Sequence, residues 1–171
     1  MGSVAPSSRY LARAVVERVP AAARCVAELG AGTGPITRAL LRHLGPEAIV
    51  LALEIDPAFC ARLRRDLRDP RLRVVEAPAQ ELPARAAGLG SSVEVVVSGL
   101  PFANFPAPLR RDIAQAAYEA LQPGGLFVGY GYAPFVLPRL LRAVFGNCRA
   151  GFVGRNLPPA FVFTAHKRAS A

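Results

Sequence analysis

The stretch Glu28-Leu-Gly-Ala-Gly-Thr-Gly34 decides the fold, because it joins an apolar run, Cys25 to Ala27, to a segment with the apolar spacing of a helix. Its glycines at positions 30, 32 and 34 let the backbone turn sharply and approach a ligand where a Cβ atom would collide. The stretch is therefore predicted to be a ligand-binding turn between a strand and a helix.

A second apolar run, Ile49 to Leu53, ends at Glu54, which lies 24 positions after Gly30. A glycine-rich turn with an acidic residue about 20 positions later is typical of a doubly wound sheet that holds a ribose. Dinucleotide enzymes use G-x-G-x-x-G and place a pyrophosphate at the helix N-terminus. This chain reads G-x-G-x-G directly after Glu28, whose carboxylate would repel a pyrophosphate but suits a ligand with ammonium and sulfonium charges. We therefore predict that the ligand is S-adenosylmethionine.

Strands and helices alternate along most of the chain, which is typical of a parallel sheet covered by helices. The last two predicted strands are too close in sequence for a parallel crossover, so one of them should be reversed. The predicted fold is α/β: a Rossmann-like, seven-stranded, mostly parallel sheet with one antiparallel strand and helices on both faces. Strands are expected at 25–29, 48–54, 72–76, 93–97, 126–130, 149–155 and 161–166, and helices at 35–44, 57–68, 110–121 and 135–145, after an N-terminal helix within 1–20 that Ser7 and Ser8 can cap.

Length and composition favour a single domain over residues 1–171, since 52% of the residues are hydrophobic and 19% are charged. The net charge of +9 suggests an anionic partner such as nucleic acid or a lipid headgroup, although the arginine clusters also have the spacing of solvated helix faces. Three isolated cysteines and two histidines favour neither a metal site nor a disulfide framework. The first ten residues contain no apolar core of signal-peptide length, so we expect a cytoplasmic protein.

This pattern resembles the class I S-adenosylmethionine-dependent methyltransferases over essentially the whole chain. The resemblance implies that the first motif, formed by Glu28, Gly30, Ala31, Gly32 and Gly34, faces the methionine part of the cofactor. Glu54 then accepts hydrogen bonds from both ribose hydroxyls. Further cofactor contacts are expected from Ser8, Ile55, Ala79, Gln80 and Ser98.

The adenine contact departs from the family pattern. The family commonly carries G-D-A after its third strand, whereas this chain has Ala77-Pro78-Ala79, and Pro78 offers no side-chain acceptor. The contact is therefore expected from the backbone of Ala79 or Gln80, or from the side chain of Gln80 or Glu81. Glu81 can equally be a surface residue.

The segment Ser98-Gly-Leu-Pro-Phe102 occupies the place of the N-P-P-Y motif in amino-group methyltransferases, which include the ribosomal RNA adenine dimethylases. In those enzymes a polar side chain and a carbonyl hold the target nitrogen, and such positioning is most of the catalysis in a direct displacement. Gly99 stands where the amide would be, so an adenine acceptor loses its main polar contact.

Three segments, 5–12, 98–106 and 155–160, look like the bacterial phospholipid N-methyltransferases, which convert phosphatidylethanolamine stepwise to phosphatidylcholine. An amine acceptor must arrive unprotonated, and a hydroxyl can accept its proton or orient its nitrogen. Tyr10, Tyr130, Tyr132 and Ser98 are candidates, with Tyr10 preferred, although its ring can equally pack in the core. The expected catalytic residues are Tyr10, Ser98 and Gly99, and the expected substrate contacts are Arg9, Leu100, Pro101, Phe102, Arg155 and Asn156.

The roles of three of these residues have plain structural alternatives. Arg9 and Arg155 can pair with a substrate phosphate or the cofactor carboxylate, or can simply form surface ion pairs. Asn156 can cap the turn before Pro158 and Pro159.

The expected function is transfer of a methyl group from S-adenosylmethionine to the ethanolamine headgroup of a phospholipid. The alternatives are a soluble small-molecule amine, then adenine in RNA, and a non-catalytic nucleoside-binding module as a different class. We expect a monomer in the cytoplasm, in peripheral contact with the anionic inner surface of the membrane, and without a nucleic-acid partner.

Overall fold

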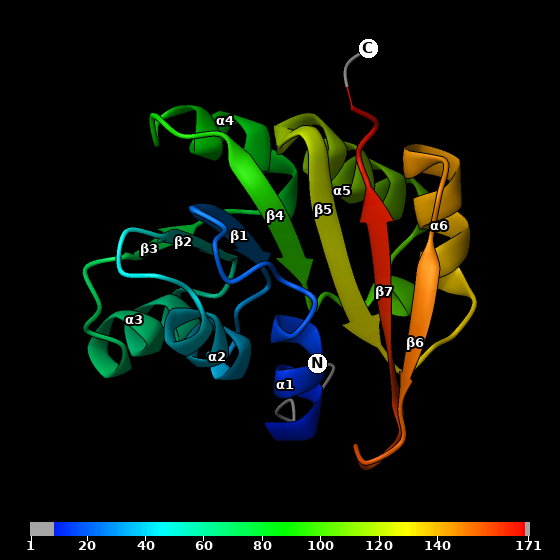
Figure 1. Cartoon of the computed structure of the whole chain (residues 1–171), viewed down its shortest axis with the longest axis horizontal. Helices are drawn as coiled ribbons and strands as arrows, with labels where there is room; N and C mark the ends of the chain where they lie inside the picture. The colour runs from blue at the N-terminus through cyan, green and yellow to red at the C-terminus, as the bar shows by residue number, and fades with distance from the viewer. Residues whose placement is uncertain (1–8, 170–171) are drawn as a thin grey trace.

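A seven-stranded sheet runs through the protein with helices on both of its faces (Figure 1), and the computed structural model describes residues 9–169. The strand order is β3-β2-β1-β4-β5-β7-β6, and β7 is antiparallel to both of its neighbours while the other pairs are parallel. This confirms the predicted α/β fold with one reversed strand. The strands are β1 Cys25–Leu29, β2 Ile49–Glu54, β3 Leu72–Glu76, β4 Val93–Ser98, β5 Leu121–Gly131, β6 Arg149–Val153 and β7 Ala160–His166.

Within residues 9–169, one α-helix precedes the first strand, and five α-helices and two 3-10 turns lie between the strands. The helices are α1 Arg9–Val16, α2 Pro35–His43, α3 Pro57–Asp66, α4 Leu82–Ala87, α5 Ala107–Ala120 and α6 Val136–Phe145, and the turns are η1 Ala79–Glu81 and η2 Phe102–Asn104. The short helix α4 and both turns were not predicted. The first helix ends at Val16 rather than at Pro20, and its predicted caps, Ser7 and Ser8, lie outside the described residues.

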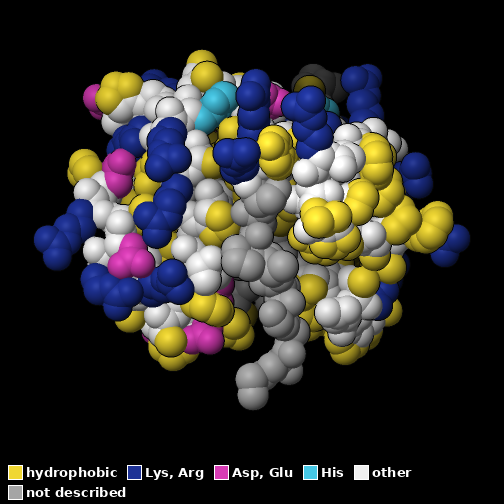
Figure 2. Space-filling model, turned by 90° about the horizontal axis from the view of Figure 1, so that it is seen from below, with side chains coloured by type: hydrophobic (Ala, Val, Ile, Leu, Met, Phe, Trp, Pro, Cys, Tyr) yellow, Lys and Arg dark blue, Asp and Glu magenta, His cyan; other side chains and the backbone are white. Residues whose placement is uncertain are grey.

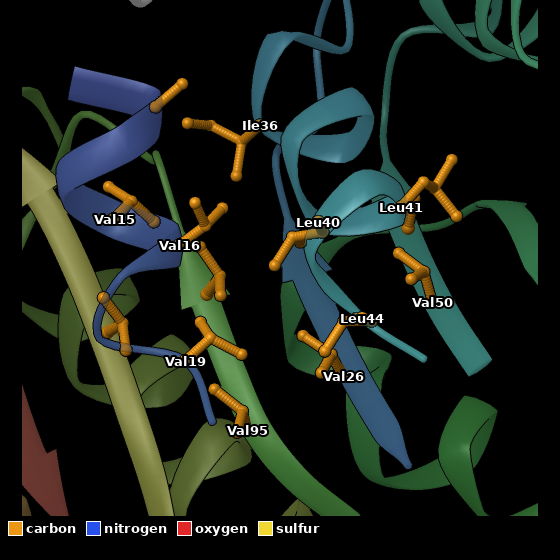
Figure 3. Packing of buried hydrophobic residues seen from close by; sticks show 14 of the residues in the cluster. Val15, Val16, Val19, Val26, Ile36, Leu40, Leu41, Leu44, Val50 and Val95 are labelled. Carbon is orange, nitrogen blue, oxygen red and sulfur yellow. The ribbon is translucent and has the colours of Figure 1, made fainter. Parts of the chain in front are cut away.

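The core has one apolar layer on each face of the sheet. On one face α1 and α2 lie side by side, and Figure 3 shows Val15 and Val16 of α1 beside Ile36 and Leu40 of α2. On the other face α4, α5 and α6 cover the sheet. All five residues of β1 are buried, as expected for a strand that has helices on both sides.

The parallel strands all end at one edge of the sheet, which is the lower edge in Figure 1. At β1 the strand order reverses: the chain first builds outward through β2 to β3 and then returns to place β4 on the other side of β1. Such a switch point leaves a crevice outside the carboxyl ends of the strands, where open α/β sheets bind ligands. The glycine turn follows β1 at this crevice.

Candidate active site

Three glycines of the turn between β1 and α2 have a left-handed backbone conformation that other residues rarely adopt. Gly30, Gly32 and Gly34 have φ values of 75°, 52° and 83°, and the Gly30 amide donates a 2.9 Å hydrogen bond to the carbonyl of Leu53. A Cβ atom on Gly30 would lie 2.6 Å from Cδ2 of Leu100, whereas one on Gly32 would meet no atom of residues 9–169 within 4 Å. The space beside Gly32 is therefore open to a ligand.

Glu54 is fixed at the end of β2 by two backbone amides. Its Oε2 accepts a 2.8 Å hydrogen bond from the Gly32 amide, and its Oε1 accepts a 3.0 Å bond from the Asp56 amide. The residue is 8% exposed. Because a carboxylate offers about four lone-pair sites, each oxygen can accept one more hydrogen bond. The structure thus presents a rigid pair of acceptors at the predicted ribose position.

Glu28 differs from the prediction, because its side chain does not line the cleft. It is buried and accepts a 2.7 Å hydrogen bond from the hydroxyl of Thr37 on α2. Burial is the main reason that the pKa of this carboxyl is raised from 4.5 to about 7. The hydrogen bond from Thr37 opposes this rise, and the nearby charge of Glu54 contributes to it. Glu28 therefore links β1 to α2 beside the glycine turn, because its side chain points to the face of the sheet that α2 covers.

A cleft of about 670 Å³ opens along this edge of the sheet. Ten of the predicted site residues meet there: Gly30, Ala31, Gly32, Glu54, Ile55, Ala79, Gln80, Gly99, Leu100 and Pro101. The other lining residues are Thr33, Pro35, Leu53, Phe59, Ala77, Pro78, Phe105, Leu109, Ile113 and Tyr130. Gly34 packs instead under the turn, where its Cβ position lies 2.7 Å from Cδ2 of Leu63.

The end of the cleft near Glu54 is lined by apolar side chains and by the segment that follows β3. Ile55, which is 69% exposed, and Phe59 on the first turn of α3 line this end with residues 77–80. Phe59 was not predicted as a site residue, although it lies on the first turn of the predicted helix that directly follows Glu54. Glu81 forms a 2.6 Å ion pair with Arg85, which is the surface role considered for it.

The other end of the cleft is formed by the turn after β4, by α5 and by β5. Ser98 is fully buried, and its hydroxyl accepts a 3.4 Å hydrogen bond from the Leu100 amide, so it shapes the turn without lining the cleft. Phe102 is 3% exposed and points into the core, with its ring centroid 6.3 Å from that of Phe105. Turn η2 therefore brings Phe105, rather than the predicted Phe102, to the cleft.

Four further predicted residues lie outside the lining of the cleft. Tyr10 is 39% exposed on α1 and accepts a 3.1 Å hydrogen bond from the Arg9 guanidinium. Arg155 is exposed in the turn between β6 and β7. Asn156 is buried in that turn and donates a 2.6 Å hydrogen bond to the carbonyl of Pro158, which is the capping role considered for it. Ser8 lies outside the described residues, and the functional roles of all five stay predictions.

The cleft suits an adenosyl ligand in three independent respects. It has open space beside a glycine backbone at Gly32, a preset pair of carboxylate acceptors at Glu54, and apolar walls at Ile55 and Phe59.

Within residues 9–169, no three histidine, cysteine or acidic side chains come together as metal ligands would. Over the same range, no helix has the length and apolar character needed to cross a membrane.

Comparison with known proteins agrees with this geometry. A family model described as a methyltransferase domain matches residues 26–125. An ornithine lipid N-methyltransferase from Singulisphaera acidiphila is 39% identical over 163 residues, which cover 94% of this chain and 85% of that protein.

Solved structures agree as well. The precorrin-6y C5,15-methyltransferase of Geobacter metallireducens is 16% identical with a TM-score of 0.76, and the alignment covers 98% of this chain and 93% of that one, which shows the shared fold. A 16S rRNA methyltransferase of T. thermophilus, solved with AdoMet and guanosine, is 26% identical with a TM-score of 0.71 over 98% of this chain and 44% of that one. The chain therefore belongs to the methyltransferase domain family, as a class I S-adenosylmethionine-dependent methyltransferase related to the lipid N-methyltransferases.

Proposed function

We propose that the enzyme methylates the amine of a lipid headgroup, with the ethanolamine group of phosphatidylethanolamine as its acceptor. The observation that carries this proposal is the two-part cleft, in which a cofactor end at Glu54 continues into an apolar end lined by Leu100, Phe105 and Leu109. An acceptor with a small amine and a long apolar tail fits such an end. The similarity to an ornithine lipid N-methyltransferase supports the same class of acceptor.

At the cofactor end, Glu54 would accept hydrogen bonds from the ribose hydroxyls, and Ile55 and Phe59 would flank the adenine. S-adenosylmethionine supplies an electrophilic methyl group on a sulfonium centre when bound. The apolar acceptor end disfavours a charged ammonium, because burial in apolar surroundings stabilises the neutral amine. A neutral nitrogen has the lone pair that a displacement requires.

We also propose that this edge of the protein contacts the anionic cytoplasmic face of the inner membrane as a peripheral surface. Four exposed apolar side chains lie at or just beyond the strand ends on this edge. They are Ile55 after β2, Phe135 after β5, Phe152 near the end of β6, and Leu157, which is 92% exposed, in the turn after β6. Figure 2 looks onto this edge and shows hydrophobic side chains gathered on one side of it, with Lys and Arg side chains nearby. Apolar area and basic charge together favour adsorption to anionic lipid.

The acceptor is tested by incubating the protein with methyl-labelled S-adenosylmethionine and four separate acceptors. These are vesicles containing phosphatidylethanolamine, vesicles containing an ornithine lipid, a soluble polyamine, and RNA. Label is expected in phosphatidylethanolamine. Label in the ornithine lipid alone would change the headgroup but keep the lipid class, whereas label only in the polyamine or RNA would refute the proposal.

The cofactor end is tested by calorimetric titration of S-adenosylmethionine into Glu54→Ala. Loss of two charge-assisted hydrogen bonds of about 1.5–3 kcal/mol each should weaken binding by at least ~100-fold. Glu47→Ala is the matched control, because Glu47 is exposed and does not line the cleft. Equal affinity of the two variants would remove Glu54 from the cofactor site.

The membrane surface is tested by sedimentation with anionic vesicles. Leu157→Asp should reduce vesicle binding and activity on vesicles, while activity on a short-chain, monomeric lipid stays unchanged. Ala22→Asp places the same charge in an exposed turn before β1, at the opposite edge of the sheet, and should change neither. Equal vesicle binding by the two variants would contradict this orientation.

A further inference from the structure

Gly99 and Tyr130 lie beside each other at the acceptor end of the cleft. Strands β4 and β5 are parallel, with Ser98 opposite Gly129, so Gly99 and Tyr130 each come one residue after that pair. Both residues line the cleft. The ring of Tyr130 is partly buried and packs against the apolar layer under α1 and α2, which holds it in place.

The backbone at position 99 does not itself require a glycine. Gly99 is absent from the glycines with positive φ, unlike Gly30 and Gly32. What excludes a side chain is the phenol of Tyr130: a Cβ atom on Gly99 would overlap the Tyr130 hydroxyl oxygen and lie 2.6 Å from its Cζ. The tyrosine thus fills the space into which a side chain at position 99 would project.

We propose that the Tyr130 hydroxyl, reaching over Gly99 from the neighbouring strand, is the polar group that holds the acceptor amine. This inference rests on the proposed amine acceptor. The hydroxyl oxygen accepts one N–H of the neutral amine, and the fixed ring keeps the nitrogen lone pair directed along the cleft toward the cofactor end. The nitrogen forms its new bond to carbon as the carbon–sulfur bond breaks and its electron pair goes to sulfur. The extra proton on the methylated nitrogen leaves to water.

This role depends on an N–H that successive methylations remove. A primary amine has two N–H bonds and a monomethyl amine has one, but a neutral dimethyl amine has none. The Tyr130 hydroxyl can therefore assist the first and second transfers and has nothing to accept in a third. Any cation–π attraction between the ring and the methylated cation needs no hydroxyl, so it is the same for tyrosine and phenylalanine.

The first experiment compares Tyr130→Phe with the wild-type protein on primary, monomethyl and dimethyl forms of the same aminolipid. We expect kcat on the primary and monomethyl amines to fall ~10- to 100-fold, the effect of one hydrogen bond to a reacting group, with unchanged S-adenosylmethionine affinity and an unchanged rate on the dimethyl amine. Tyr118→Phe is the matched control, because Tyr118 packs against Phe145 away from the cleft. Equal slowing on all three amines, or no slowing on the primary amine, would overturn the inference.

The second experiment uses Gly99→Ala, which should displace the end of the Tyr130 side chain while the backbone accepts the alanine. We expect a loss on the primary amine similar to that of Tyr130→Phe, and no further loss when the two changes are combined, because both remove the same contact. If the fold-losses in kcat of the two single variants multiply in the double variant, the two changes act independently and this coupling is refuted. If the wild-type protein labels no amine, the proposed function fails together with this inference, whereas an active wild type matched by Tyr130→Phe refutes the inference alone.

Discussion

Replacing Glu28 with glutamine should stabilise the protein at pH 8 but not at pH 4.5. The Glu28 carboxyl is 2% exposed, and burial raises its pKa from 4.5 to about 7. Between these pH values the folded protein keeps a proton that the unfolded chain has lost, so the free energy of unfolding falls as pH rises through this window. Over the whole window the loss is about 3 kcal/mol. Glutamine carries no charge at any of these pH values, and its carbonyl oxygen can still accept the hydrogen bond from Thr37.

The assay is urea unfolding of the ligand-free protein and of Glu28→Gln at pH 5, 6, 7 and 8. The difference in unfolding free energy should grow by about 3 kcal/mol in favour of the variant, or roughly 6–12 °C in thermal midpoint for a chain of this size. Glu47→Gln, at an exposed position, should show a difference that is independent of pH. A pH-independent difference for Glu28→Gln would mean that the buried carboxyl is ionised in the folded state, and the reasoning would be wrong.

Two further predictions concern stability. Gly34→Ala should lower the unfolding free energy by about 2–4 kcal/mol, because it combines a left-handed backbone with a Cβ 2.7 Å from Cδ2 of Leu63. Gly32→Ala, whose Cβ meets no described protein atom within 4 Å, should cost only about 1–2 kcal/mol and mainly weaken cofactor binding; thermal unfolding and calorimetry separate the two effects. Arg71→Ala should cost about 2–3 kcal/mol by urea unfolding, since its guanidinium pairs with Asp69 at 2.8 Å and donates to three backbone carbonyls around the end of α2; Arg71→Lys should restore only part of the loss, because lysine lacks the planar array of donors.

The sequence was sufficient for the sheet and for bringing the glycine turn and Glu54 together at the cleft. The chemistry there is local: Gly30 and Gly32 must be glycines to form the turn, and Glu54 must follow a buried strand to reach it. Helix α4 was missed because it has six residues and buries only Leu82 and Ala86, which is too short for a helical period to stand out.

The residues that line the proposed acceptor end could not all be predicted from the sequence, because their positions depend on contacts between strands. Tyr130 reaches Gly99 through the register of β5 on β4, and a single sequence does not reveal that register. Phe102 and Phe105 are equivalent as aromatic residues in the sequence, and only turn η2 decides which one faces the cleft. Tyr10 was preferred because it follows Ser7 and Ser8, the predicted helix cap, and it lies outside the lining of the cleft.

The contact between Leu100 and Gly30 has a consequence for redesign of this enzyme. The proposed donor pocket is lined by residues within 30–80 and the proposed acceptor pocket by residues within 99–130, so the two could be diversified separately. Leu100 is the exception: its Cδ2 rests where a Gly30 side chain would be, so altering it would also disturb the donor pocket. A mutant library aimed at new acceptors should vary Phe105, Leu109 and Ile113 and keep Leu100 constant.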